Sequence, residues 1–541
     1  MRTLLTTLCL LLALPVLGVL GAWLTLDDAA MAVLRHQWHT VLPDYAWESA
    51  LLAGGVALGV MLLGSATAAA VTLFEFPGRR HFEWALLLPL AMPGYVLAYA
   101  WTDALQFSGA LQSGLRSLLG QRGALWPDVR SLGGAVLLFV LCLYPYVYLL
   151  ARAALGERAV RLMEAARLLG APMRRRVLEV ALPMARPAIA AGTALALMET
   201  LADYGVGSYF GLSTFSTGIY KAWLVMNDRI AAAQLAAVLL VVVAGLLMAE
   251  RSAQRRMRYA TSRSAAGGSE ARPLALRGWA ALPLWLLCGL PVLLGFVAPV
   301  AWLAQMLWQE AQVSAQGSGL GLPLARFAGW AWSSFQLAAG AAVLATLLAL
   351  ALGFALRQGG ARRGLLQPAA RVLSLGYAVP GAVIAVGILL PVGWLQERWP
   401  QAGAAALATG TVLGLMYAYL VRFSAVALQT VEAGYARVPA SIDETARMLG
   451  GGPRRIFVEL HLPLLKRSAL AAALLVFVDV MKELPATLVL RPFGSDTLAV
   501  VAYNFARDER LAEAALPSLA IVAVGLLPVI LLSRALRAPQ A

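Results

Sequence analysis

A stretch of twenty residues occurs twice in this chain, 280 positions apart. Residues Glu164–Pro183 read EAARLLGAPMRRRVLEVALP, and residues Glu444–Pro463 read ETARMLGGGPRRIFVELHLP. The two copies align without a gap and are identical at ten positions. Each copy is polar and rich in arginine, and each lies between long apolar segments. A repeat of this length indicates two equivalent halves, so the fold must present the same polar element twice.

The apolar segments indicate a membrane protein. Hydrophobic residues make up 60% of the 541 residues and charged residues only 13%, whereas soluble domains carry about 25% charged residues. A transmembrane helix needs about 20 predominantly apolar residues, and over such lengths only a helix satisfies its own backbone within lipid. We therefore predict an all-α membrane protein with about twelve transmembrane helices, at residues 3–25, 48–74, 84–103, 131–151, 184–202, 230–249, 280–307, 333–356, 372–393, 403–421, 468–486 and 511–533.

The basic residues predict the orientation of these helices. If the chain starts in the cytoplasm, 31 of the 43 Lys and Arg residues lie in loops on that side and 11 on the other side. Such an asymmetry follows the positive-inside rule, so both termini and both repeated stretches are expected in the cytoplasm. Contact of basic loops with anionic lipid explains most of these charges, and we expect no nucleic-acid partner.

The repeat extends beyond the polar stretch and predicts the domain organisation. At the same offset, the equivalent pairs are Glu199 and Asp479, Asp203 and Glu483, and Thr217 and Thr497. We predict a first six-helix domain at residues 1–250, a cytoplasmic linker at 251–278 and a second six-helix domain at 279–541. Six is an even number, so the two domains have the same orientation and a transport pathway is expected between them.

Signals of catalysis are missing from the sequence. A phosphate-binding loop needs a lysine followed by Ser or Thr, but Lys221, Lys466 and Lys482 are followed by Ala, Arg and Glu. The three cysteines lie in apolar runs without the spacing of a metal site or a disulfide framework. We therefore expect no enzymatic activity, no resident metal and no cofactor bound by this chain.

Each repeated stretch is expected to form a short helix that ends at a glycine, Gly170 or Gly450. A single helix of this kind would be interpreted as an ordinary loop helix resting on lipid headgroups. Two closely similar copies favour an alternative interpretation, in which both helices dock onto a partner with two-fold symmetry.

These stretches resemble the cytoplasmic EAA loop of permease subunits in binding-protein-dependent ABC importers, and the resemblance covers nearly the whole chain as two fused permease domains of the type I importer kind. In that family the short helix, called the coupling helix, fits a cleft of a separate ATPase. The resemblance implies an inner-membrane location and two copies of a P-loop ATPase, which bind ATP and Mg²⁺. It assigns ATPase coupling to Glu164, Ala165, Ala166, Arg167, Gly170, Glu444, Thr445, Ala446, Arg447 and Gly450. Thr445 replaces the first Ala of the EAA pattern, which is a mild departure.

A narrower resemblance concerns the substrate. The segments Glu199–Trp223 and Lys482–Val500 are similar to those of fused ferric-iron permeases, which implies a binding protein that delivers Fe³⁺. Related permeases for thiamine and other small solutes share this layout, so they stay open as an alternative. An ion-coupled secondary transporter would also explain twelve helices, although it would not explain the two repeated stretches.

Five residues at the ends of the equivalent fifth helices are candidates for the substrate path or gate: Glu199, Asp203, Tyr204, Asp479 and Glu483. Charges within a membrane are costly, so they are usually functional or paired. Asp479 and Lys482 are three residues apart and can neutralise each other. Oxygen ligands suit a hard cation such as Fe³⁺, although Asp203 and Glu483 can equally hold an outer gate by hydrogen bonds.

Overall fold

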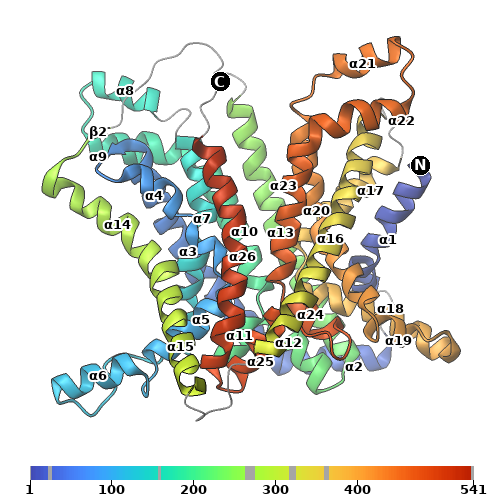
Figure 1. Cartoon of the computed structure of the whole chain (residues 1–541), viewed down its shortest axis with the longest axis horizontal. Helices are drawn as coiled ribbons and strands as arrows, with labels where there is room; N and C mark the ends of the chain where they lie inside the picture. The colour runs from blue at the N-terminus through green and yellow to red at the C-terminus, as the bar shows by residue number, and fades with distance from the viewer. Residues whose placement is uncertain are drawn as a thin grey trace. The chain divides into compact units, whose positions relative to one another are not determined.

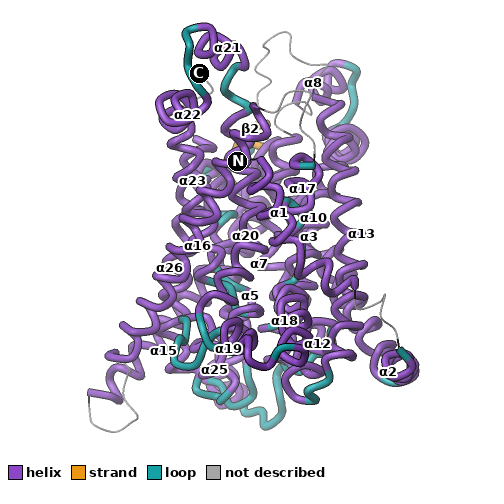
Figure 2. The backbone as a smooth tube through the Cα atoms, turned by 90° about the vertical axis from the view of Figure 1, so that its right-hand side faces the viewer, coloured by secondary structure: helices purple, strands orange, loops and turns teal. Residues whose placement is uncertain are grey.

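The computed structural model describes residues 2–21, 27–155, 160–261, 274–315, 324–358 and 365–537. Within these ranges the chain is almost entirely helical (Figure 2). The only strands there are β1 (Phe74–Glu75) and β2 (Leu274–Ala275), which form a short parallel pair. Residues 262–273 of the predicted linker lie outside the described ranges. The predicted all-α class is confirmed.

Nine helices in the described part of the chain are long and apolar enough to cross a membrane, or ten if one strongly bent pair counts as a single span. Two predicted spans of the second repeat, 372–393 and 468–486, are not among them. The first is interrupted between Leu373, where one helix ends, and α18 (Gly381–Arg398), which Pro380 directly precedes. The second lies mostly within α23 (Leu462–Met481), whose Lys466, Arg467 and Asp479 add charge to an otherwise apolar helix.

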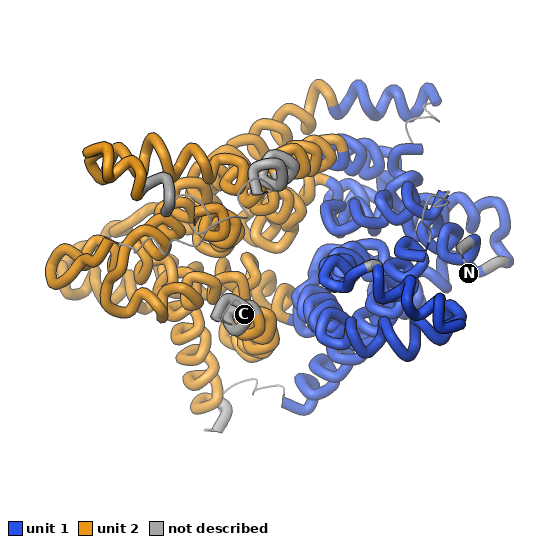
Figure 3. Tube along the Cα trace, turned by 90° about the horizontal axis from the view of Figure 1, so that it is seen from above, with its two compact units in different colours: residues 1–37, 219–240, 323–501 blue, residues 38–218, 241–322, 502–541 orange. Residues whose placement is uncertain are grey.

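The chain divides into two compact units, coloured separately in Figure 3. Unit 1 comprises residues 1–37, 219–240 and 323–501, and unit 2 comprises residues 38–218, 241–322 and 502–541. Each unit therefore combines the middle helices of one repeat with terminal segments of the other repeat. The predicted domains at residues 1–250 and 279–541 follow the sequence repeats and are a different division of the chain from these compact units. The predicted domain boundaries stay a prediction.

The centre of unit 2 is formed by α3 (Val41–Leu73), α7 (Leu132–Ala154) and α10 (Leu182–Ala202), which pack against one another. Glycines permit this packing: a Cβ added to Gly64 would lie 2.6 Å from Val147 Cβ, and one added to Gly192 would lie 2.7 Å from Val147 Cα. Small residues at such positions allow membrane helices to approach closely.

Helices from the second repeat complete unit 2. They are α14 (Leu282–Val292), α15 (Ala298–Ala315) and α26 (Leu511–Arg537). The indole Nε1 of Trp302 on α15 donates a hydrogen bond of 2.9 Å to Asp103 on α5 (Gly94–Leu105). Two short helices also belong to this unit, α4 (Arg79–Ala85) and α6 (Ala110–Leu119).

Unit 1 has an equivalent centre, formed by α16 (Leu324–Gln358), α20 (Val412–Tyr435) and α23. Helices from the first repeat complete it: α1 (Arg2–Gly21) packs on α17 (Leu366–Leu373) and α18, and α2 (Asp28–His39) meets α13 (Arg229–Thr261). The contact between α2 and α13 is a hydrogen bond of 2.8 Å from Gln234 Nε2 to the Ala30 carbonyl. The short helices of this unit include α19 (Ala404–Thr409).

Candidate functional site

The two repeated stretches form the same local structure. In the first loop (residues 160–181), α8 (Val160–Leu168) is followed by α9 (Met173–Arg175) and a π-helical turn that leads into α10. In the second loop (residues 440–461), α21 (Ala440–Met448) is followed by α22 (Pro453–Arg455) and a π-helical turn that leads into α23. Helices α8 and α21 are labelled in Figure 1.

A left-handed glycine ends the first helix of each loop. Gly170 has φ +80° and Gly450 has φ +81°. In the first loop the Gly170 N–H donates a hydrogen bond of 2.9 Å to the Arg167 carbonyl. The N–H of Ala171 donates a hydrogen bond of 3.0 Å to the Ala166 carbonyl. The second loop repeats both hydrogen bonds at 2.9 Å, which is the Schellman pattern of a helix end. A Cβ at either glycine would meet no atom within 4 Å, so the backbone conformation alone favours glycine there.

The predicted coupling residues show the same exposure in both loops. Glu164, Ala165 and Arg167 are exposed, and so are Glu444, Thr445 and Arg447. Ala166 and Ala446 are half-buried. The structure therefore presents equivalent faces at the two predicted coupling helices.

Each loop also carries an exposed apolar pair that the sequence analysis did not identify. Leu168 and Leu169 are 85% and 87% exposed, and Met448 and Leu449 are 88% and 82% exposed. Large apolar side chains exposed next to each other are typical of contact surfaces. The sequence did contain a signal for this exposed pair, because two apolar residues stand directly before each glycine.

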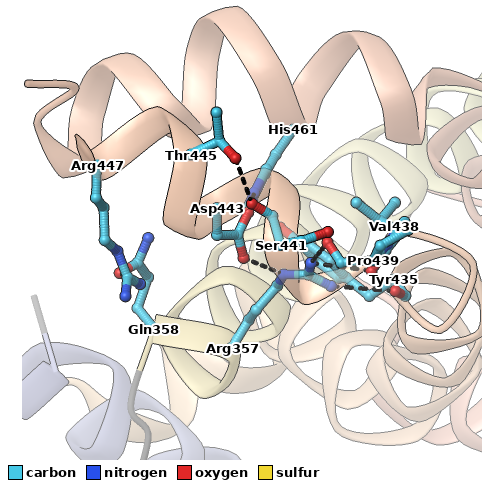
Figure 4. A network of polar contacts seen from close by, with 10 residues as sticks. All are labelled: Arg357, Gln358, Tyr435, Val438, Pro439, Ser441, Asp443, Thr445, Arg447 and His461. Carbon is cyan, nitrogen blue, oxygen red and sulfur yellow. Dashed lines mark hydrogen bonds and ion pairs between the residues drawn. The ribbon is translucent and has the colours of Figure 1, made fainter. Parts of the chain in front are cut away.

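The second loop is fixed to α16 by a buried polar network (Figure 4). Asp443 lies at its centre. Its Oδ2 accepts a hydrogen bond of 2.5 Å from Arg357 Nε, and its Oδ1 lies 2.6 Å from His461 Nε2. The Tyr435 hydroxyl lies 3.2 Å from His461 Nδ1. We call Arg357, Tyr435, Asp443 and His461 the clamp.

The clamp also satisfies the backbone where α20 meets α21. Arg357 donates from Nη2 to the carbonyls of Val438 and Pro439, both at 2.9 Å. Burial by itself raises the pKa of Asp443, but the hydrogen bonds and charges of Arg357 and His461 outweigh burial and leave that pKa below its usual value. The carboxylate is therefore ionised and paired at neutral pH.

The sequence of the first loop lacks equivalents of two clamp residues. At the repeat offset, Asp443 corresponds to Met163 and His461 to Ala181, neither of which can carry a charge. The sequence analysis did not identify Asp443 as a candidate residue. The pairing of Asp443 with Arg357, 86 residues away, needed the tertiary structure.

The candidate path residues Asp203 and Glu483 each lie two positions before a short helix. Asp203 Oδ1 accepts a 2.7 Å hydrogen bond from Val206 N–H at the start of α11 (Gly205–Phe210). Glu483 accepts from the N–H groups of Ala486 and Thr487, at 2.9 and 3.0 Å, at the start of α24 (Pro485–Leu490). Both carboxylates thus have a capping role.

The surroundings of these residues differ between the repeats. Glu483 is buried and forms an ion pair of 3.2 Å with Arg422, which sequence analysis had not singled out. Asp479 and Lys482 form the anticipated ion pair, at 2.9 Å. Asp203 belongs to unit 2 and Glu483 to unit 1, and their assignment to the substrate path or gate stays a prediction.

The other two candidates lie in unit 2. Glu199 is half-buried on α10, and Tyr204 is half-buried between α10 and α11. The Tyr204 hydroxyl lies 3.2 Å from the Tyr503 hydroxyl. Among the described residues, no group of three or more His, Cys, Asp or Glu side chains has the arrangement of a metal site.

Comparisons with known proteins agree with this architecture. The family model for the binding-protein-dependent transport system inner membrane component matches twice, at residues 60–255 and 345–538. The Fe(3+)-transport system permease protein FbpB 2 of Haemophilus influenzae is 25% identical over 88% of this chain and 87% of its own length.

Two shorter relatives match part of the chain. The putative 2-aminoethylphosphonate transport system permease protein PhnU of Salmonella choleraesuis is 28% identical over 37% of this chain and 70% of its own length. The molybdenum transport system permease protein ModB of Escherichia coli is 30% identical over 30% of this chain and 72% of its own length. The chain therefore belongs to the family of binding-protein-dependent transport system inner membrane components, as an ABC importer permease with two copies of the family's domain.

Proposed function

We propose that this permease carries ferric iron into the cytoplasm, receives it from a binding protein on the outer side and is driven by two copies of a separate ATPase. The observation that carries the substrate assignment is the match to the Fe(3+)-transport permease, which extends over 88% of this chain and 87% of that protein. A match of that extent includes both repeats and the segments between them.

The geometry of the two loops supports the proposed ATPase partners. Both loops end their exposed helix with the same glycine turn and present an apolar pair at the same position. Two identical ATPase subunits would require two identical contact surfaces. In this proposal ATP and Mg²⁺ are bound by those subunits, and the permease contributes the coupling residues of α8 and α21.

The candidate path residues fit a hard cation as cargo. Carboxylate and phenol oxygens suit such a cation, and Asp203 and Tyr204 are adjacent at the end of α10. Because the Glu483 carboxylate is occupied by Arg422 and the start of α24, we assign it to holding the gate. Glu199 and Asp203 are assigned to the path.

A second candidate substrate is an oxyanion. The relatives named for 2-aminoethylphosphonate and molybdenum transport favour it, although each matches only 37% or 30% of this chain.

Uptake into vesicles distinguishes the two candidates. The chain is reconstituted with the ATPase and binding protein encoded by neighbouring reading frames, and vesicles receive iron-55, labelled molybdate or labelled 2-aminoethylphosphonate. We expect iron uptake that stops when ATP is replaced by a non-hydrolysable analogue. Uptake of an oxyanion without iron uptake would contradict the iron assignment. Iron uptake driven by an ion gradient without ATP would contradict the ATPase assignment.

A further inference from the structure

Three oxygen-bearing side chains meet in unit 2, and none of the functions described above requires their contact. Tyr204 lies between α10 and α11, Ser208 lies on α11, and Tyr503 lies on α25 (Leu498–Arg507). The Tyr503 hydroxyl is 2.8 Å from Ser208 Oγ and 3.2 Å from the Tyr204 hydroxyl. We call these three residues the oxygen cluster; Figure 1 labels its helices α11 and α25.

The spacing of these oxygens suits a small cation. A small hard cation in octahedral coordination binds oxygens at about 2.0–2.1 Å, which places neighbouring ligand oxygens about 2.9 Å apart. The two measured separations bracket this value. These separations are also those of hydrogen bonds, and a bound cation would take the place of the hydrogen bonds in the oxygen cluster. Asp203, next to Tyr204, places a carboxylate beside the same turn.

A buried hydroxyl without a partner lies nearby. Tyr99 of α5 is 1% exposed, and its hydroxyl has no hydrogen-bond partner among the described residues. Its ring packs edge-on against Tyr209 at 4.9 Å, and it is close enough to Tyr503 and Asp203 to interact electrostatically with both. Buried hydroxyls are nearly always satisfied, so this one indicates a water or ligand that the region accommodates.

The oxygen cluster is not a general requirement of the repeat. At the same offset the second repeat has Leu484 in place of Tyr204 and Leu488 in place of Ser208. Both repeats nevertheless form the same short helix after the fifth span, α11 in one and α24 in the other. The oxygen cluster therefore depends on residues that only the first repeat carries at these two positions.

We infer that Tyr204, Ser208 and Tyr503 form a transient binding site for ferric ion on the permease itself. This inference rests on the proposed function, because it concerns the same cargo. As each Fe–O(phenolate) bond forms, the phenol O–H bond breaks and its proton passes to water, while the iron stays Fe³⁺.

Spectroscopy and uptake together test this site. The purified full-length permease in lipid nanodiscs is titrated with ferric nitrilotriacetate, and the visible charge-transfer absorption of a ferric–phenolate bond is recorded. We expect the band in the wild type and its loss in the Tyr204→Phe, Tyr503→Phe double variant. Phenylalanine keeps the packing of the two rings, whose centroids are 5.7 Å apart, and removes only the hydroxyls.

A matched control removes a different buried phenol of the same unit. The Tyr148 hydroxyl donates to the Glu83 carbonyl at 2.9 Å, away from the oxygen cluster, and Tyr148→Phe is expected to keep the band. In the complete importer, the double variant is expected to lose iron-55 uptake by at least tenfold, while Ser208→Ala loses less.

The outcomes separate this inference from the proposed function. A wild-type permease without the band, or a double variant with normal iron uptake, would overturn the oxygen cluster as an iron site and leave the iron importer intact. A wild-type importer that takes up an oxyanion and no iron would overturn the proposed function. A band that persists in the double variant would show that iron binds elsewhere and would overturn the inference.

Discussion

The first and second loops have the same tip and different bases. At the tip, Gly170 and Gly450 have φ values within 1° of each other, and both loops expose two apolar residues before the glycine. At the base, the second loop is tied to α16 through Asp443, whereas the first loop has Met163 at the equivalent position. The surface offered to a partner is therefore the same, but its attachment to the permease differs.

This difference separates two requirements. A partner with two identical subunits requires the same tip on both loops, but it places no such demand on the base. We expect the base to determine how firmly movement at the tip is transmitted to the membrane helices. The clamp provides a rigid connection in the second loop, from α21 to α16 and, through His461, to the turn before α23.

The strongest test of the comparison asks whether both loops lie on the same side of the membrane. Ala165→Cys and Thr445→Cys place thiols at equivalent exposed positions. Both are expected to react with a membrane-impermeant maleimide only from the cytoplasm, because basic loops stay inside. Cys9, Cys142 and Cys288 are buried and should give little background. Labelling of only one variant from outside would break the equivalence of the loops.

The next largest effect is expected at the two glycines. Gly170→Val and Gly450→Val should each insert normally but lose most ATP-driven uptake, because a β-branched residue is strained at positive φ. An added Cβ at either position meets no atom of the permease within 4 Å, so a clash within the permease would not explain the loss. ATPase co-purification and iron-55 uptake measure the effect.

Gly452→Val is the matched control for the glycine variants. Gly452 has φ −70° and no neighbour within 4 Å of an added Cβ, so a valine there should preserve uptake. Equal losses in Gly452→Val and Gly450→Val would show that the left-handed turn is not the cause.

A change in the clamp should affect only the second loop. Asp443→Ala leaves Arg357 and His461 without their shared partner, and removal of one member of a buried ion pair costs about 3–5 kcal/mol. We expect faster hydrogen exchange in α21 and unchanged exchange in α8, measured by mass spectrometry. Ser441→Ala, at an exposed position of the same helix, should leave both unchanged. Equal protection of α21 in Asp443→Ala and wild type would show that the clamp is not what anchors this loop.

Acid should destabilise the second loop, but less than the Asp443→Ala substitution does. The pKa of Asp443 is lowered in the folded protein from an ordinary value of about 3.9. The carboxylate therefore stabilises the second loop fully above about pH 4, and this contribution is lost as the pH falls through the lowered pKa. Pepsin cleavage at Met448–Leu449, relative to Leu168–Leu169, should increase between about pH 4 and 2. Asp443→Asn should abolish the pH dependence of this ratio.

The smallest effect is expected at the exposed ion pairs that both loops share. Arg175 pairs with Glu179 at 2.6 Å and Arg455 with Glu459 at 2.8 Å. All four side chains are well exposed, and surface pairs contribute little because water and salt screen them. Arg175→Ala and Arg455→Ala should leave assembly and uptake unchanged. A large loss in either variant would identify that arginine as a direct partner contact.

Several features were predictable because they depend on local sequence. The glycine turns follow from a short helix that ends at glycine, and the ion pair of Asp479 with Lys482 follows from their spacing of three residues. The interruption of the helix before α18 was harder to predict from the sequence, because hydropathy alone predicts one continuous transmembrane helix at residues 372–393. Pro380 marks the break, and the equivalent Pro93 precedes α5 in the first repeat.

The sequence by itself determined the membrane class, the two repeats, the family resemblance and the positions of the two exposed loop helices. These properties depend on hydrophobicity, on identity between the copies and on residues close together in the chain. The tertiary structure decided which distant residues meet: Arg357 with Asp443, Arg422 with Glu483, and Tyr204 with Tyr503. It also decided that each compact unit takes segments from both repeats. The physical reason is that such contacts depend on how helices pack, and packing is set by side-chain shape across segments that the linear order keeps far apart.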